Sequence, residues 1–246
     1  SFKDAKTAAF SETSDTLLII GALRSAHDPG LLPLFNSLRD DKPAENRVYG
    51  MVSAAVVSKD PKQIDLDLLV SSRDGALAGS ALAGLIDANV ISDAQLRTIV
   101  SDSTDSALRA MASGELNHRK ALKDRGILRA LLTSDKDSVR YYAATSLLEN
   151  ASGGISDPDT AAALAALKQM SAAHDLRQAP VQALMLVRIE KNNIAAAGPW
   201  VQQVAEDDQN DEGLRYTAIG TLLALKNPEG PRILGQKAAH GGQTGD

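Results

Sequence analysis

The sequence repeats itself with a period of about 31 residues, and this repeat limits the fold more than any other feature. Its recurring frame is an anchor residue with an apolar residue directly before it, a small residue three steps later and a large one seven steps later. In the clearest copy these are Val139, the anchor Arg140, Ala143 and Leu147. The other anchors are Arg47, Ala78, Arg109, Arg177 and Arg215. Repetition at this period is typical of stacked supersecondary units.

The offsets of the frame place its apolar residues on one face of an α-helix. In the fifth copy the frame is expected at Leu176–Arg177, Pro180 and Leu184, where the proline should kink the helix or delay its start. Ahead of each anchor lies a second apolar segment of helical spacing. These segments are 31–38, 64–70, 94–100, 127–132, 161–170 and 200–205. Each unit is therefore predicted to be a helix–turn–helix of about 31 to 38 residues.

Composition agrees with helices. Ala and Leu supply 71 of the 246 residues, whereas aromatic residues make up only 3%. Both are strong helix formers, and the residues that favour strands are scarce. We therefore predict an all-α fold.

Polar residues mark the expected helix ends. Asp28–Pro29, Asp60–Pro61, Ser92–Asp93 and Asp157–Pro158 each place a capping side chain before a first helix. Short polar turns rich in aspartate separate the two helices of a unit, where acidic side chains also favour the positive end of the second helix.

The stretch 135–147, DKDSVRYYAATSL, is similar to the second helix of HEAT repeats, and 211–222 is similar to a lesser degree. The chain thus resembles the HEAT-repeat family in its short bacterial form, which is related to bilin-lyase HEAT-like repeats. The resemblance covers about residues 14 to 226 and implies a right-handed α-solenoid of about six to seven stacked repeats. Ala78, in place of an anchor arginine, and Pro180 depart from the family pattern.

The repeats are expected to form one solenoid over 1–226, followed at 227–246 by a C-terminal cap and a Gly-rich tail. Their approximate bounds are 1–24, 25–58, 59–90, 91–119, 120–151, 152–190 and 191–226.

Two sets of residues invite a functional interpretation. The resemblance implies that the arginines form a structural ladder, each bonding a group in an inter-helix turn; the alternative is a basic stripe for an anionic partner. These are Arg47, Arg109, Arg140, Arg177 and Arg215. Tyr141 and Tyr216 share the position after the anchor, where they either bind a partner or pack between repeats. Trp200 is either a third partner-binding aromatic or an inter-repeat core residue.

The sequence offers little for catalysis. No cysteine is present, and the four histidines are far apart with no metal-ligand spacing. No phosphate-binding loop or nucleophile elbow occurs. We therefore expect no catalytic residue, no metal site, no cofactor and no small-molecule substrate. The net charge of −5 disfavours nucleic acid, and the longest apolar run, Leu17–Leu23, is too short to insert in a membrane.

Strong repetition with little chemistry favours a non-enzymatic interaction or scaffold module that binds another protein chain through its concave face or ends. One alternative, implied by the resemblance, is a subunit of a bilin-lyase-like enzyme that attaches or removes a chromophore. A more remote one is a repeat-fold DNA glycosylase, although pI 5.4 and a single Trp do not suit a basic track. The absence of cysteine favours an extracytoplasmic (periplasmic or secreted) location over the cytoplasm.

Overall fold

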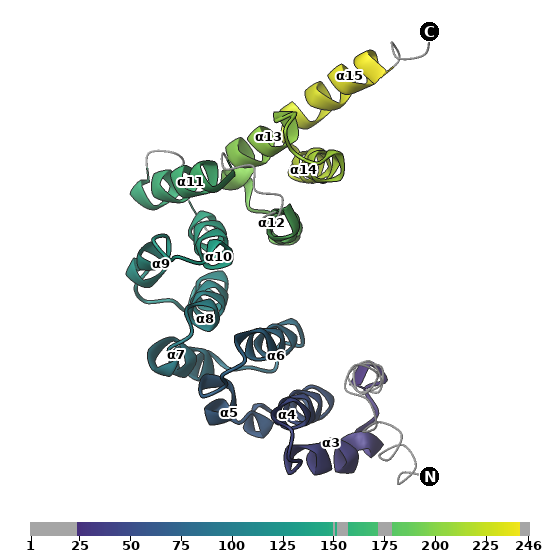
Figure 1. The fold of residues 1–246 in the computed structure, drawn as a ribbon, viewed down its shortest axis with the longest axis vertical. Helices are drawn as coiled ribbons and strands as arrows, with labels where there is room; N and C mark the ends of the chain where they lie inside the picture. The colour runs from purple at the N-terminus through teal and green to yellow at the C-terminus, as the bar shows by residue number, and fades with distance from the viewer. Residues whose placement is uncertain (1–23, 150, 152–156, 172–178, 242–246) are drawn as a thin grey trace. The chain divides into compact units, whose positions relative to one another are not determined.

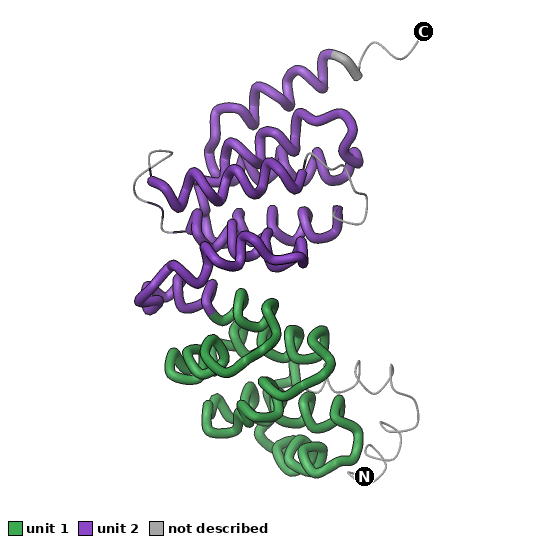
Figure 2. The backbone as a smooth tube through the Cα atoms, turned by 60° about the vertical axis from the view of Figure 1, so that its left-hand side comes forward, with its two compact units in different colours: residues 1–112 green, residues 113–246 purple. Residues whose placement is uncertain are grey.

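The computed structural model describes residues 24–149, 151, 157–171 and 179–241. Within these ranges the regular structure is entirely helical, with no strand, as predicted (Figure 1). The chain divides into two compact units, Ser1–Ala112 and Ser113–Asp246 (Figure 2). Among the described helices, none is long and apolar enough to cross a membrane.

The described part of the first unit consists of short helices in pairs, and a 3-10 turn precedes each of the first two pairs. Its elements are η1 (Pro29–Leu31), α3 (Leu32–Arg39), α4 (Ala44–Ser58), η2 (Pro61–Gln63), α5 (Leu66–Val70), α6 (Gly75–Asp87), α7 (Asp93–Asp102) and the start of α8 (Ser106–His118). Each pair matches one expected helix–turn–helix, since α3 packs on α4 and α5 on α6.

The second unit continues the pattern. Its elements after α8 are α9 (Gly126–Leu131), α10 (Asp137–Leu148), α11 (Pro158–Ser171), α12 (Ala179–Lys191), η5 (Ala195–Ala197), α13 (Gly198–Glu206), α14 (Glu212–Ala224) and α15 (Glu229–Gly241). Within this unit α12 contacts both α10 and α14, which places the second helices of successive pairs in one row (Figure 1). The first helices α11, α13 and α15 form a neighbouring row, because α13 contacts both of the others.

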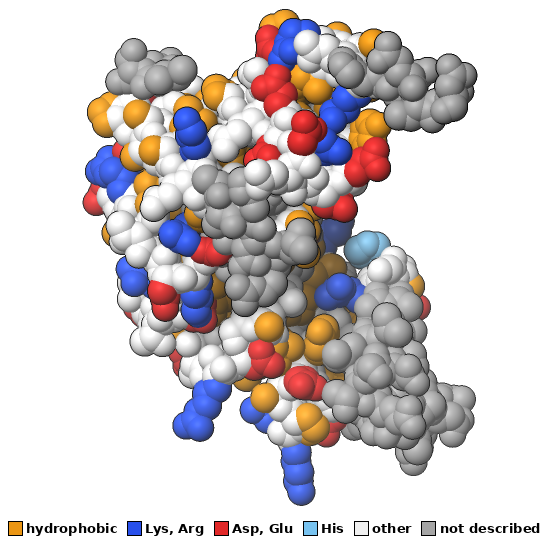
Figure 3. All heavy atoms as spheres, turned by 45° about the horizontal axis from the view of Figure 1, so that its top comes forward, with side chains coloured by type: hydrophobic (Ala, Val, Ile, Leu, Met, Phe, Trp, Pro, Cys, Tyr) orange, Lys and Arg blue, Asp and Glu red, His pale blue; other side chains and the backbone are white. Residues whose placement is uncertain are grey.

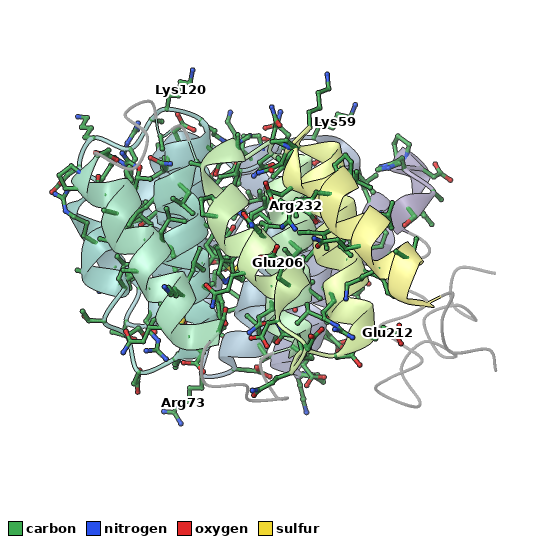
Figure 4. The ribbon with its side chains drawn as sticks, turned by 90° about the horizontal axis from the view of Figure 1, so that it is seen from above. Lys59, Arg73, Lys120, Glu206, Glu212 and Arg232 are labelled. Carbon is green, nitrogen blue, oxygen red and sulfur yellow. The ribbon has the colours of Figure 1, made fainter. Side chains whose placement is uncertain are left out.

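The last helix, α15, covers the segment that was expected to cap the final repeat. Its Ile233 is buried, and the helix packs on α13 and α14. Arg232 adds ion pairs to Glu206 of α13 and to Glu229 (Figure 4). Such exposed pairs contribute little, so Ile233 provides most of the attachment.

The helix starts are capped as the sequence predicts. Asp28 accepts a hydrogen bond from the N–H of Gly30 at 2.8 Å, and Asp60 accepts one from Lys62 at 3.0 Å. Ser92 and Gln95 form a reciprocal capping box at α7. Asp157 accepts from Thr160 at 3.1 Å at the start of α11. These bonds satisfy N–H groups that a helix leaves free in its first turn.

The small residue of the frame allows close helix approach, most clearly at Gly50 in α4. A Cβ there would lie 2.6 Å from the Cβ of Leu38 and 2.7 Å from the carbonyl oxygen of Phe35, both in α3. No side chain fits at those distances, so glycine permits the α3–α4 contact. The third-step and seventh-step residues of the first, second, third, fourth and sixth copies are all buried.

The expected register of the fifth copy is wrong. Pro180 and Leu184 are exposed, and the buried stripe of α12 is Gln182, Met185 and Ile189. Gln182 therefore occupies the anchor place, and the expected anchor Arg177 lies outside the described residues. The reason is Pro180, which has no N–H and is tolerated only in the first turn, so the packed part of the helix starts after it.

The helix ends carry a second trace of the repeat. His27, Lys59, Asn89 and Lys120 have φ near +50°, at steps of 32, 30 and 31 residues; Asn193 and Lys226 do the same, 33 apart. The last five lie one or two residues after the second helices α4, α6, α8, α12 and α14. A left-handed residue at this place ends a helix and lets its last carbonyls be bonded, as the N–H of Ala121 bonds the carbonyl of Leu116 at 2.7 Å.

Glycine at such a position should stabilise the fold. Lys120 has φ +57° and its side chain points into solvent (Figure 4), so Lys120→Gly removes no packing and relieves a left-handed conformation that non-glycine residues disfavour. We expect Lys120→Gly to raise the free energy of unfolding by about 1 kcal/mol, as measured by urea denaturation. Ala88→Gly is the control, because Ala88 is exposed in the right-handed conformation at φ −77° and gains nothing from glycine. Equal effects of the two substitutions would contradict the assignment.

Candidate functional site

The anchor arginines lie within their own helix pairs. Arg47 donates to the carbonyl oxygens of Asp41 at 3.1 Å and Lys42 at 2.7 Å. Arg140 pairs with Asp137, and Arg215 pairs with Asp208. Arg109 is partly exposed, and its buried Nε has no hydrogen-bond partner. The three paired guanidiniums thus brace inter-helix turns and present no unpaired stripe to an anionic partner.

Acidic and basic side chains are also mixed on the surface. On the face drawn in Figure 3, Lys and Arg are interspersed with Asp and Glu. Among the described residues, no group of three or more potential ligands is placed to hold a metal ion.

Two of the three sequence-predicted aromatics lie together in the core of the second unit. Tyr141 is 0% exposed and Trp200 is 2% exposed, with ring centroids 6.0 Å apart. The indole Nε1 of Trp200 donates to the hydroxyl of Ser171 at 2.7 Å, and the amide Nε2 of Gln182 donates to the hydroxyl of Tyr141 at 2.9 Å. Burial raises the pKa of the Tyr141 phenol. Both residues pack between helices, and in this conformation neither reaches a partner.

Tyr216 differs from them. It lies on α14 and is 49% exposed, so of the three aromatics it is the one that a partner can touch.

A buried polar cluster joins the ends of three helices. Glu149, which follows α10, is 3% exposed. Its carboxylate accepts from Nδ1 of His118, at the end of α8, at 2.5 Å and from Arg188, near the end of α12, at 3.0 Å. Arg188 also donates to the Thr145 hydroxyl at 2.7 Å and lies over the ring of Tyr142. A cavity of about 320 Å³ adjoins the cluster, lined further by Leu148, Ala151 and residues 192–196.

This cluster has part of the geometry of a catalytic site. A carboxylate on one imidazole nitrogen orients the ring and leaves the other nitrogen for proton transfer. Among the described side chains, Glu149 is the one within hydrogen-bonding distance of His118. The arrangement ties helix ends together. The sequence did not reveal it, because His118, Glu149 and Arg188 are 31 and 39 residues apart with no shared motif.

Two surface depressions are less specific. One, of about 620 Å³, lies between α11 and α13 and is lined by both Lys168 and Glu206. The other, of about 500 Å³, lies beside the start of α4 and includes Arg47 and Arg73 together with Glu45 and Asp74. Each mixes opposite charges, which gives no clear preference for a ligand.

Exposed apolar side chains, in contrast, are confined to one unit. Among the described residues, every large hydrophobic side chain that is at least 41% exposed belongs to the second unit, on α12, α14 or α15. We call this set the apolar surface; its members are Leu184, Val187, Tyr216, Leu223 and Leu234. Leu184, at 64%, is the most exposed of them. Side chains of this kind, grouped on neighbouring helices, mark interaction sites more often than single ones do.

Comparisons with known proteins add no residue assignments. No protein-family model, no curated protein and no solved structure matches the chain. The roles of its residues therefore rest on the geometry of the described helices.

Proposed function

We propose that the chain is a HEAT-like α-solenoid that works as a non-catalytic interaction module and binds a partner protein through the apolar surface of its second unit. The observation that carries the proposal is the confinement of exposed Leu184, Val187, Tyr216, Leu223 and Leu234 to this unit. Burying such side chains against a partner would stabilise a complex by about 25 cal/mol per Å² of apolar area before the entropy of association is subtracted.

The repeat supports the same proposal. Helix pairs that stack on their neighbours present an extended surface whose side chains need no mutual chemistry. The recurring frame and the left-handed residues at the ends of the second helices both repeat at intervals of about 31 residues. Among the described residues, the paired anchor arginines brace inter-helix turns and the cluster around Glu149 ties helix ends together.

Photo-crosslinking in cells that express the full chain tests the proposal. A photoreactive amino acid replaces Leu184, Tyr216 or Leu234 in turn. Ser80 of α6 is the matched control, because it is exposed and stands two residues after its anchor, as Leu184 stands two residues after Gln182. We expect one defined protein to crosslink at the second-unit positions and not at Ser80.

The captured protein is then purified and its affinity measured by calorimetry. Leu184→Asp combined with Leu223→Asp should weaken binding at least tenfold, since each places a charge in a buried contact. No crosslink above the Ser80 level, or a captured protein whose affinity is unchanged by the double variant, would overturn the proposal.

A further inference from the structure

Two second helices of the same unit share five of twelve residues but differ in the exposure of two of them. Helix α10 reads DSVRYYAATSLL and α14 begins EGLRYTAIGTLL, so that Arg, Tyr, Ala and two Leu fall at matching places. Tyr141 and Leu148 of α10 are 0% and 2% exposed, whereas their counterparts Tyr216 and Leu223 of α14 are 49% and 41% exposed. Because the residue types are identical, the neighbours must account for the difference.

On α10 the neighbour is α12. Gln182 of α12 donates to the Tyr141 hydroxyl at 2.9 Å, and the Thr145 hydroxyl lies 3.6 Å from the sulfur of Met185. Leu148 lines the same cavity as the turn after α12, residues 192–196. Helix α12 and the turn after it thus cover this edge of α10, together with Trp200 of α13, whose ring lies 6.0 Å from that of Tyr141.

On α14 the corresponding edge, which we call the open edge, consists of Tyr216, Gly220 and Leu223. The closest contacts of α14 are with α12, α13 and α15, and none of these buries the open edge. Gly220 stands where α10 has Thr145, and a Cβ added to it would meet nothing within 4 Å. No described residue therefore fills beside α14 the space that Met185 occupies beside α10.

We infer that the open edge binds an amphipathic α-helix of a partner chain, laid beside α14 as α12 lies beside α10. This inference rests on the proposed function and names the partner's structural class. An amide side chain on the docked helix donates to the Tyr216 hydroxyl, and an apolar side chain three residues later fills the space over Gly220. The docked helix needs no arginine at the position that Arg188 holds in α12. Arg188 pairs with Glu149, and the residue of α14 that corresponds to Glu149 is Ala224, which has no charge.

The chain itself supplies the probe. A peptide of residues 179–194 carrying Arg188→Ala has the required amide at Gln182 and apolar side chains at Met185 and Ile189. A hydrocarbon staple between positions 183 and 187 holds it helical, because a free peptide of this length is a marginal helix in water. Both stapled positions lie on the side of α12 away from the Met185–Arg188 contacts with α10. Binding to the full chain is followed by fluorescence anisotropy.

We expect saturable binding that Leu223→Asp in the protein weakens at least tenfold and Tyr216→Phe weakens about fivefold through loss of one hydrogen bond. Ser80→Asp in α6 is the control, because Ser80 is exposed and lies outside the second unit, and it should leave the affinity unchanged. Gln182→Ala in the peptide should weaken its affinity by about the same factor as Tyr216→Phe in the protein.

No binding at about 1 mM peptide, or binding insensitive to Leu223→Asp, would overturn the helix inference. Photo-crosslinking would still report on the proposed function, since it does not depend on the partner's secondary structure. If the peptide fails and light scattering shows a dimer that Leu223→Asp dissociates, the occupant is a second copy of the chain and the inference is wrong.

Discussion

Trp200→Ala is expected to lower the free energy of unfolding of the second unit by about 4 kcal/mol, the range for a buried large-to-small substitution. Trp200 is among the largest fully buried side chains and touches the ring of Tyr141. Its removal leaves a cavity between α10 and α13 and takes the hydrogen-bond donor from Ser171. Thermal unfolding of the full chain, followed by far-UV circular dichroism, should show the transition of this unit about 12 °C lower.

Two variants separate packing from hydrogen bonding. Trp200→Phe keeps a ring beside Tyr141 but loses the indole N–H. The lost hydrogen bond should lower the free energy of unfolding by about 1 to 2 kcal/mol, in addition to the effect of the smaller side chain. Ser171→Ala should cost less in the Trp200→Phe background than in the native chain, because the hydroxyl has lost the indole donor and keeps its hydrogen bond with Tyr141. Tyr216→Ala is the aromatic control at an exposed site and should stay within about 0.5 kcal/mol. If Trp200→Ala lowers the free energy of unfolding no more than Tyr216→Ala does, Trp200 is not buried as described.

The helix pairs were predictable because their signal is local. Apolar side chains at steps of three and four mark one face of a helix, and Asp–Pro and Ser–Asp mark its start. The helices and the four caps were confirmed by the structure, and the pairs α3–α4, α5–α6, α9–α10 and α13–α14 pack together. The register of α12 was mispredicted because Leu176, Pro180 and Leu184 satisfy the same frame as Val181, Met185 and Ile189. An Ala- and Leu-rich helix offers more than one apolar stripe, and only packing selects between them.

Burial of individual side chains was less predictable for the same reason. Tyr141 and Tyr216 occupy one place in the frame, yet α12 and Trp200 of α13 cover the first, whereas the second is 49% exposed. The polar cluster around Glu149 had no sequence signature at all, because its three members come from the ends of three different helices. Such contacts depend on how neighbouring helices are aligned, which no single stripe encodes.

Glu149→Ala is expected to destabilise the second unit by about 3 kcal/mol, because it leaves Arg188 with no anion in a site that is largely closed to water. The Arg188 side chain is 13% exposed and retains only the Thr145 hydroxyl and the face of Tyr142. His118 loses the partner of its Nδ1 as well, but its half-exposed ring can bond water. Urea denaturation of the full chain measures the loss.

The double variant Glu149→Leu with Arg188→Met decides between a buried charge penalty and lost packing. It replaces both ions by apolar groups of similar length, so it should recover most of the stability lost in Glu149→Ala. A coupling energy near zero in the corresponding double-mutant cycle would mean that the two side chains do not interact.

The same variants separate structure from function at this cluster. The double variant removes the carboxylate that orients His118 while keeping the fold, so a cluster that only clamps α8, α10 and α12 should leave partner affinity at the apolar surface unchanged. Loss of affinity in a variant of normal stability would instead assign His118 and Glu149 a direct part in binding. The expected result is unchanged affinity, because Arg188 faces α10, whereas Leu184 and Val187 of the same helix are exposed and the remaining members of the apolar surface lie on α14 and α15.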